Sequence, residues 1–198
     1  MKKIFIVLFI CIPAISYSQF KIPNDTNFKC SHLNKFKYPD IKPSIEKSLS
    51  FELRLWTSTY AVDSAYLLRL TCNQKDIWKA EKYLINYYNN KIIKTEIQLP
   101  SNWNEIWDTL LVNNVLTLPD NPPHKNNRII EDDGIPNVET AITDGTSYTV
   151  ELLSKENNRK YSIDNPIGYF KFYSDSKPLK DFNKILEILS QIFNCKFK

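Results

Sequence analysis

The chain has 198 residues, of which 26 are Lys or Arg and 22 are Asp or Glu, so its formal net charge is +4. Hydrophobic residues make up 42% and aromatic residues 13% of the sequence, which excludes disorder as the global state. The charge is too small to favour nucleic acid or an anionic membrane surface as a partner.

The first 18 residues have the pattern of a secretory signal peptide. Two lysines precede an apolar run at 4–15, and the small side chains that follow predict cleavage after Ser18. The run is short for an uncleaved membrane anchor, and the bulky residue before Cys11 disfavours lipid attachment. No later apolar run is long enough to span a membrane. We therefore expect a secreted or periplasmic protein.

Three cysteines remain after this cleavage, namely Cys30, Cys72 and Cys195. In an oxidising compartment one pair is expected to form a disulfide and to leave one thiol over. Spacing does not decide among the three pairings, and we favour Cys30–Cys72 because these two emerge first during export. Three buried free thiols are the alternative, since a chain of this length can fold without a disulfide.

The mature chain divides into a lead-in and one domain. Residues 19–50 are polar and contain three prolines, which predicts an extended segment. Residues 51–198 are too few for two independent cores and contain no internal repeat, so they are expected to form a single domain.

Four strands are predicted in the first half of this domain. Residues 51–56 alternate apolar and polar side chains, and 66–72 is a second apolar run after a short link. The segment 77–88 fits either a strand or a helix, and we favour the strand. Asn89-Asn90 then suits a tight turn, and 92–99 is its partner strand.

Two amphipathic helices are predicted further along. Apolar residues recur at helical spacing from Trp103 to Leu118, with a cap at Ser101 or Asn102 and a stop at Pro119. A second helix begins at Pro178 and runs towards the C-terminus.

A loop and a hairpin separate the two helices. Residues 119–137 lack periodicity, and long loops of this kind are often functional. Residues 146–153 and 160–164 are predicted strands joined by a turn at Asn157-Asn158. The fold class is therefore α+β, with a hairpin-rich antiparallel sheet of about six strands packed against two amphipathic helices.

No motif for catalysis or cofactor binding is found. The mature glycines, Gly134, Gly145 and Gly168, are too far apart for a phosphate-binding loop. The histidines, His32 and His124, lack the further ligands that zinc requires, so no cofactor or metal is expected.

One acidic segment is the basis of a hydrolase hypothesis. Glu131, Asp132 and Asp133 lie near His124 in the 119–145 loop, and carboxylates can act on glycan or envelope bonds. A solvated acidic loop is the simpler interpretation, because adjacent carboxylates rarely flank a reacting bond. The spaced pattern of a calcium loop is also missing.

Aromatic side chains support the favoured hypothesis, which is a non-enzymatic exported protein that binds a protein or an envelope component. Tryptophan and tyrosine anchor interfaces and stack on sugars. Trp56, Tyr83, Tyr87 and Tyr173 are the candidates for an exposed patch, although core packing is the alternative for each ring.

Overall fold

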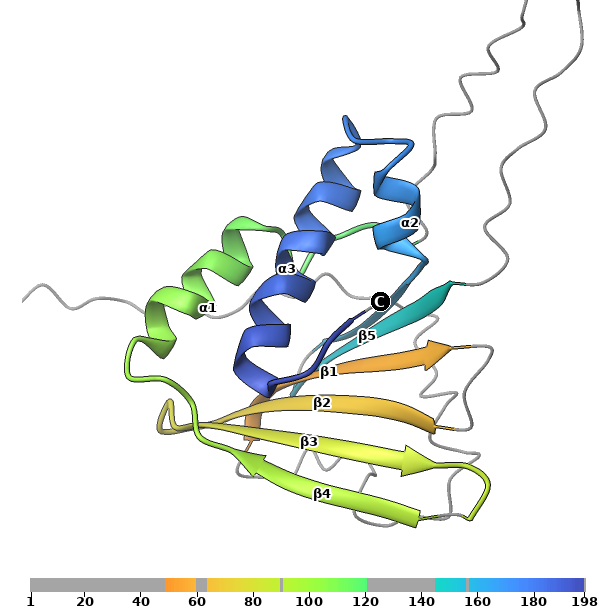
Figure 1. Ribbon diagram of the computed structural model, residues 1–198. Coiled ribbons are helices and arrows are strands. Elements are labelled where there is room, and N and C mark those ends of the chain that lie inside the picture. Colours follow the sequence, from red (N-terminus) through yellow and green to blue (C-terminus); the bar gives the residue numbers. More distant parts are fainter. Residues whose placement is uncertain (1–48, 60–63, 90, 121–144, 156, 198) are drawn as a thin grey trace, which may run out of the picture.

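The structure is a computed structural model, shown in Figure 1. It describes residues 49–59, 64–89, 91–120, 145–155 and 157–197.

One antiparallel sheet of six strands organises the described chain. The strands are β1 (Leu49–Thr59), β2 (Ser64–Asn73), β3 (Trp78–Asn86), β4 (Lys91–Ile97), β5 (Thr146–Ser154) and β6 (Asn158–Asp164). Their order in the sheet is β4-β3-β2-β1-β5-β6, and β4 and β6 form its edges. The predicted α+β class is thus confirmed, and the segment at 77–88 is a strand as favoured. The first strand begins at Leu49, two residues before the predicted boundary.

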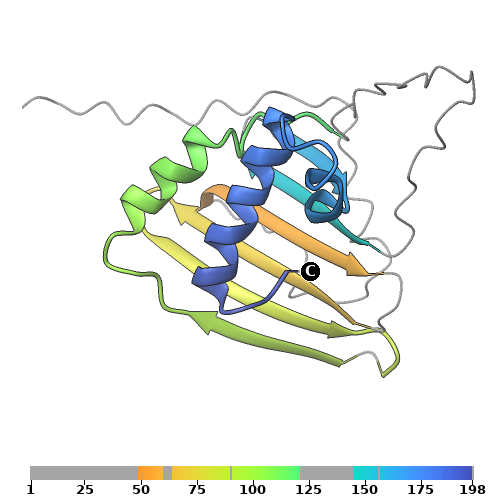
Figure 2. The ribbon, with the colours of Figure 1, turned by 45° about the horizontal axis from the view of Figure 1, so that its top comes forward.

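Three helices pack on one face of this sheet, as Figures 1 and 2 show. They are α1 (Trp103–Val112), α2 (Pro166–Phe170) and α3 (Lys177–Phe193). No helix of the described chain lies on the opposite face of the sheet, which we call the second face. No helix among the described residues is long and apolar enough to span a membrane.

Helix α1 is shorter than the sequence predicts, because two asparagines end it. Asn113 is its C-cap, and Asn114 adopts a left-handed φ of 59°. The backbone N–H of Val115 then bonds the carbonyl of Leu110, which satisfies one of the last carbonyls of the helix. Val115 and Leu118 still reach the core, from the turns that follow. Their helical spacing therefore reflects burial and not continued helix.

Helix α2 was not predicted, because its five residues are too few to show a helical period. Asn165 is the N-cap with a left-handed φ of 42°, and its side-chain carbonyl accepts a hydrogen bond from the N–H of Gly168 at 3.2 Å. Pro166 occupies the first helical position, where its missing N–H costs nothing.

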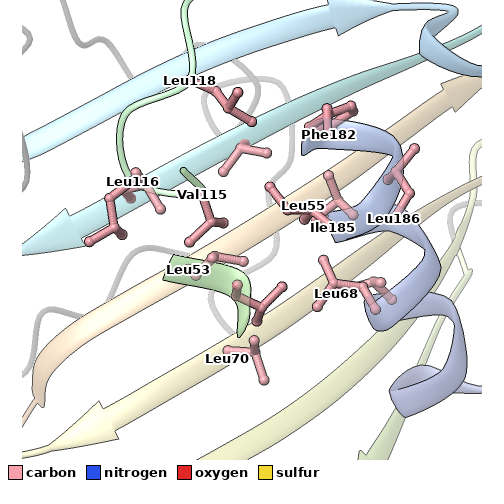
Figure 3. Close-up of a cluster of buried hydrophobic side chains, with 14 of the residues drawn as sticks. Leu53, Leu55, Leu68, Leu70, Val115, Leu116, Leu118, Phe182, Ile185 and Leu186 are labelled. Carbon is pink, nitrogen blue, oxygen red and sulfur yellow. The ribbon is translucent and has the colours of Figure 1, made fainter. Parts of the chain in front are cut away.

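The main core lies between the sheet and the helices (Figure 3). Leu53 and Leu55 from β1 and Leu68 from β2 face Phe182 and Ile185 of α3, and all five are buried. At the other end of the core, an aromatic group joins β1 and β3 to α1. It consists of Phe51, Trp78, Trp103 and Trp107, with ring centroids 4.6–6.2 Å apart.

Candidate functional site

The second face of the sheet carries a row of charges that crosses all six strands. Directly paired positions place one charged residue on each strand in turn. From β6 to β4 these residues are Lys160, Glu151, Arg54, Arg69, Glu81 and Glu96. We call this set the charged row.

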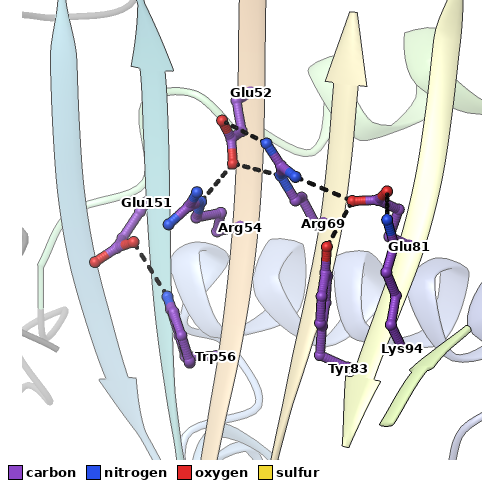
Figure 4. A network of polar contacts seen from close by, with 8 residues as sticks. All are labelled: Glu52, Arg54, Trp56, Arg69, Glu81, Tyr83, Lys94 and Glu151. Carbon is purple, nitrogen blue, oxygen red and sulfur yellow. Dashed lines mark hydrogen bonds and ion pairs between the residues drawn. The ribbon is translucent and has the colours of Figure 1, made fainter. Parts of the chain in front are cut away.

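Glu52 joins the two central cations of the charged row (Figure 4). Its Oε1 accepts hydrogen bonds from Nε of Arg54 at 2.5 Å and from Nε of Arg69 at 2.7 Å. Both Glu52 and Arg54 are at most 1% exposed. A single carboxylate between two guanidinium groups offsets the repulsion of two neighbouring positive charges in a poorly solvated place.

Glu81 extends the network towards β4. Its Oε2 accepts from Arg69 Nη1 at 3.1 Å and from the Tyr83 hydroxyl at 2.8 Å, while Lys94 Nζ lies 2.6 Å from Oε1. Burial alone would raise the pKa of Glu81, but these hydrogen bonds and nearby cations outweigh it and lower that pKa. Glu81 is therefore held in its ionised form.

Glu151 lies on the other side of Arg54, and its pKa is shifted in the opposite direction to that of Glu81. Its Oε2 accepts from the indole N–H of Trp56 at 3.1 Å. Its Oε1 is buried without a hydrogen bond in the described part of the molecule. Burial is the largest influence and raises the pKa of Glu151, even though Trp56 and Arg54 favour the charged form.

These contacts assign the charged row a structural role. Arg54 and Glu151 are too deeply buried to touch a ligand from solution, and the Arg69 side chain is only 12% exposed. A slip of one residue in β1 would turn Glu52 and Arg54 into the apolar core and bring Leu53 to the charged face, so the network specifies the register of the sheet.

A groove between α1 and α3 is the more accessible candidate. Its volume is about 420 Å³, within the range of small-ligand and side-chain pockets. Isoleucines from both helices and a proline form apolar walls, and two glutamines and a threonine supply polar groups. The lining residues are Gln98, Pro100, Ile106, Thr109, Ile188, Gln191 and Ile192.

This lining can bind but offers little for proton transfer. None of the seven side chains titrates near neutral pH. Amide and hydroxyl groups can each donate and accept hydrogen bonds, and the isoleucines exclude water from an apolar group. The groove therefore suits an uncharged, partly apolar ligand.

The structure does not bring the four predicted aromatic residues together. Trp56 and Tyr83 are 5% and 1% exposed and pack in a small cluster on the second face. Tyr87 lies in the β3–β4 turn and is 43% exposed. Tyr173 lies between α2 and α3, half-buried, with its ring centroid 6.3 Å from that of Tyr169.

The remaining candidates all lie outside the described residues. These are Cys30, His124, Glu131, Asp132 and Asp133.

The two described thiols, Cys72 and Cys195, are both free. Burial is the main cause that raises the pKa of each. No disulfide joins the described residues. Cys30 lies outside them, so the Cys30–Cys72 disulfide stays a prediction.

Sequence reasoning missed the charged row and the groove for different reasons. The alternation at 51–56 did show Glu52, Arg54 and Trp56 on one face, which was a usable signal. Their partners on β2, β3 and β5 follow only from strand register. The groove depends on how α1 and α3 are placed relative to each other. No local sequence pattern encodes that placement.

The comparisons with known proteins give no family for this chain. No family model matches it, and no curated protein is detectably similar. The fold and the described surfaces are thus the basis for assigning a class, which is a two-layer α+β domain with helices on one face.

Proposed function

We propose that the protein is an exported, non-enzymatic binding protein that holds an uncharged, partly apolar segment of a partner protein in the α1–α3 groove. The observation that carries this proposal is the lining of the groove, in which apolar side chains from two helices are combined with amide and hydroxyl groups. Export is supported by the N-terminal sequence pattern at 1–18.

The chemistry of the groove favours a protein segment over a charged envelope component. A phosphate or carboxylate would need a cation to offset its desolvation, and no lysine, arginine or histidine of the described ranges belongs to the lining. An apolar side chain can instead bury its surface against Ile106, Ile188 and Ile192. Its neighbouring backbone amides would pair with Gln98 and Gln191.

A matched pair of photo-crosslinking positions tests the proposal. Gln191 is exposed on α3 at the groove, whereas Asn104 is exposed on α1 and lies on the opposite side of that helix from Ile106. A photoreactive residue placed at position 191 of the exported protein should crosslink to a discrete partner in producing cells. The same residue at position 104 should not.

Filling the groove provides the second arm of this test. Gln191→Trp places a large ring at the groove, and Asn104→Trp places the same ring away from it. We expect Gln191→Trp to abolish partner crosslinking from a second groove position, Thr109, and Asn104→Trp to leave it unchanged. Equal crosslinking at positions 191 and 104, or none at either, would contradict the proposal.

Export has a separate test. N-terminal sequencing of the protein recovered from outside the cytoplasm should begin at Gln19, directly after Ser18. Recovery of an intact Met1 terminus would contradict cleavage. The alternative hypothesis, a hydrolase that uses carboxylates in the 119–145 loop, stays a prediction because residues 121–144 lie outside the described ranges.

A further inference from the structure

Strand β4 is an edge strand with an open outer side. It pairs with β3 on one side, and no described strand pairs with it on the other. Five of its seven residues are exposed, including the central Ile93, Lys94, Thr95 and Glu96. An exposed edge presents unpaired backbone donors and acceptors that can accept another strand.

The sequence of β4 is complementary to itself about Thr95. Two copies that pair antiparallel with Thr95 opposite Thr95 place Lys94 opposite Glu96 of the other copy, and Ile93 opposite Ile97, each twice. Residues directly opposite each other share a face, so the ion pairs fall on the second face and the isoleucines on the helix face. A twofold axis perpendicular to the sheet produces this register.

One feature within the single chain favours this partner. Glu96 lies directly opposite Glu81 on β3, and two like charges in that position repel each other. Glu81 is neutralised by Arg69 and Lys94, but no described residue forms an ion pair with Glu96. Lys94 of the same chain attracts Glu96 but is bonded to Glu81. Lys94 of a second copy would add a positive charge directly opposite Glu96, and its ammonium group has donors left after bonding Glu81.

We propose that the protein forms a homodimer through antiparallel pairing of its two β4 strands about Thr95, which creates one continuous sheet of twelve strands. The charge pattern Lys94–Glu96 sets the register, and the isoleucine pairs bury apolar surface at the join. Lys94 of each copy then recognises Glu96 of the other copy. The proposal rests on residues of β4, none of which lines the groove.

Complementary charge variants test this dimer. Sedimentation velocity of the wild-type mature protein should show a monomer–dimer equilibrium that shifts with concentration. Lys94→Glu places carboxylates opposite carboxylates, and Glu96→Lys places ammonium groups opposite ammonium groups. Each variant alone should dimerise at least roughly tenfold more weakly than the wild type.

Mixing the two variants is the decisive measurement. In a mixed pair, the carboxylates at positions 94 and 96 of one chain face the ammonium groups at positions 94 and 96 of the other. The mixture should therefore dimerise more strongly than either variant alone, and the double exchange Lys94→Glu/Glu96→Lys should dimerise like the wild type. Lys184→Glu, at an exposed position of α3, is the matched control and should not change the monomer–dimer equilibrium.

Several results would overturn the proposal. A wild-type protein that stays monomeric up to millimolar concentration contradicts it directly. A dimer that persists in both single variants would place the interface elsewhere. Far-ultraviolet circular dichroism of each variant verifies that the sheet is intact, and if Lys94→Glu proves unfolded, Glu96→Lys alone must weaken the dimer for the proposal to stand.

Discussion

The indole N–H of Trp56 bonds Oε2 of Glu151 at 3.1 Å and so links β1 to β5, although the two residues are 95 positions apart in the sequence. This carboxylate is fully buried, and its second oxygen has no hydrogen bond in the described part of the molecule. The free energy of its ionisation therefore depends mainly on burial, and it can be measured through the pH dependence of stability.

Glu151→Gln is expected to stabilise the protein at neutral pH. Burial raises the pKa of Glu151 in the folded chain above its ordinary value of about 4.3. Its contribution to stability is thus fully present below that ordinary pKa and lost as pH rises through the folded pKa. Glutamine keeps an acceptor for Trp56 and carries no charge. Urea unfolding should show a gain at neutral pH that disappears below about pH 4.

Glu81→Gln is expected to act in the opposite direction. Its pKa is lowered in the folded chain, so its contribution is present above the ordinary pKa and lost as pH falls through the folded pKa. The substitution should reduce the free energy of unfolding at neutral pH by about 1–2 kcal/mol, because it removes charged hydrogen bonds. Equal effects of the two substitutions at neutral pH would contradict this assignment.

Glu52→Ala should be among the most destabilising single changes on the second face. It removes the carboxylate that bridges the buried Arg54 and the partly buried Arg69 and leaves both positive charges without it. The expected loss is about 3–5 kcal/mol in the free energy of unfolding, measured by chemical denaturation. Glu187→Ala is the control, since its ion pair with Lys184 is exposed and should contribute less than about 1 kcal/mol.

Gly168→Ala tests the packing around Asn165. An added Cβ would lie 2.6 Å from Oδ1 of Asn165, the atom that accepts the α2 hydrogen bond. We expect a loss of about 1–3 kcal/mol in thermal or chemical unfolding. The double variant Gly168→Ala/Asn165→Gly should recover most of it, because glycine frees the space and tolerates the left-handed φ. No recovery would mean that the strain lies elsewhere.

The redox state of the cysteines can be read by intact mass. Alkylation of the unfolded mature protein without reduction should modify one thiol if the predicted Cys30–Cys72 disulfide forms. Cys195 would then be that thiol, because it is the one cysteine of the predicted mature chain that the pair leaves over. Alkylation of all three thiols before reduction would contradict the pairing. In the native protein, burial raises the pKa of Cys195, so its alkylation should be slow at neutral pH.

The strands could be predicted from the sequence because their apolar periodicity is local. Six strands and both longer helices were located, since a period of two or of 3.6 residues leaves a mark on neighbouring positions. The end of α1 was wrong because Val115 and Leu118 are buried from turns and keep the helical spacing by coincidence. Helix α2 has five residues and is too short to show any period.

The candidate sites could not be predicted, because they depend on pairings between distant segments. Arg54 and Glu151 are opposite each other only through the β1–β5 register, which passes over the whole of β2, β3, β4 and α1. The sequence makes Trp56 and Tyr83 candidates for an exposed patch, with core packing as the alternative. In the structure, the second face is itself buried at those positions.

The left-handed positions of the described chain have a thermodynamic consequence. They are occupied by Asp76, Asn114, Asn165 and Asn194, whereas glycine, the most flexible residue, occurs only three times in the whole sequence. An unfolded chain with so little glycine has fewer backbone conformations to lose when it folds. Part of the stability of this protein therefore comes from the restricted entropy of its denatured ensemble, which no contact in the folded state reveals.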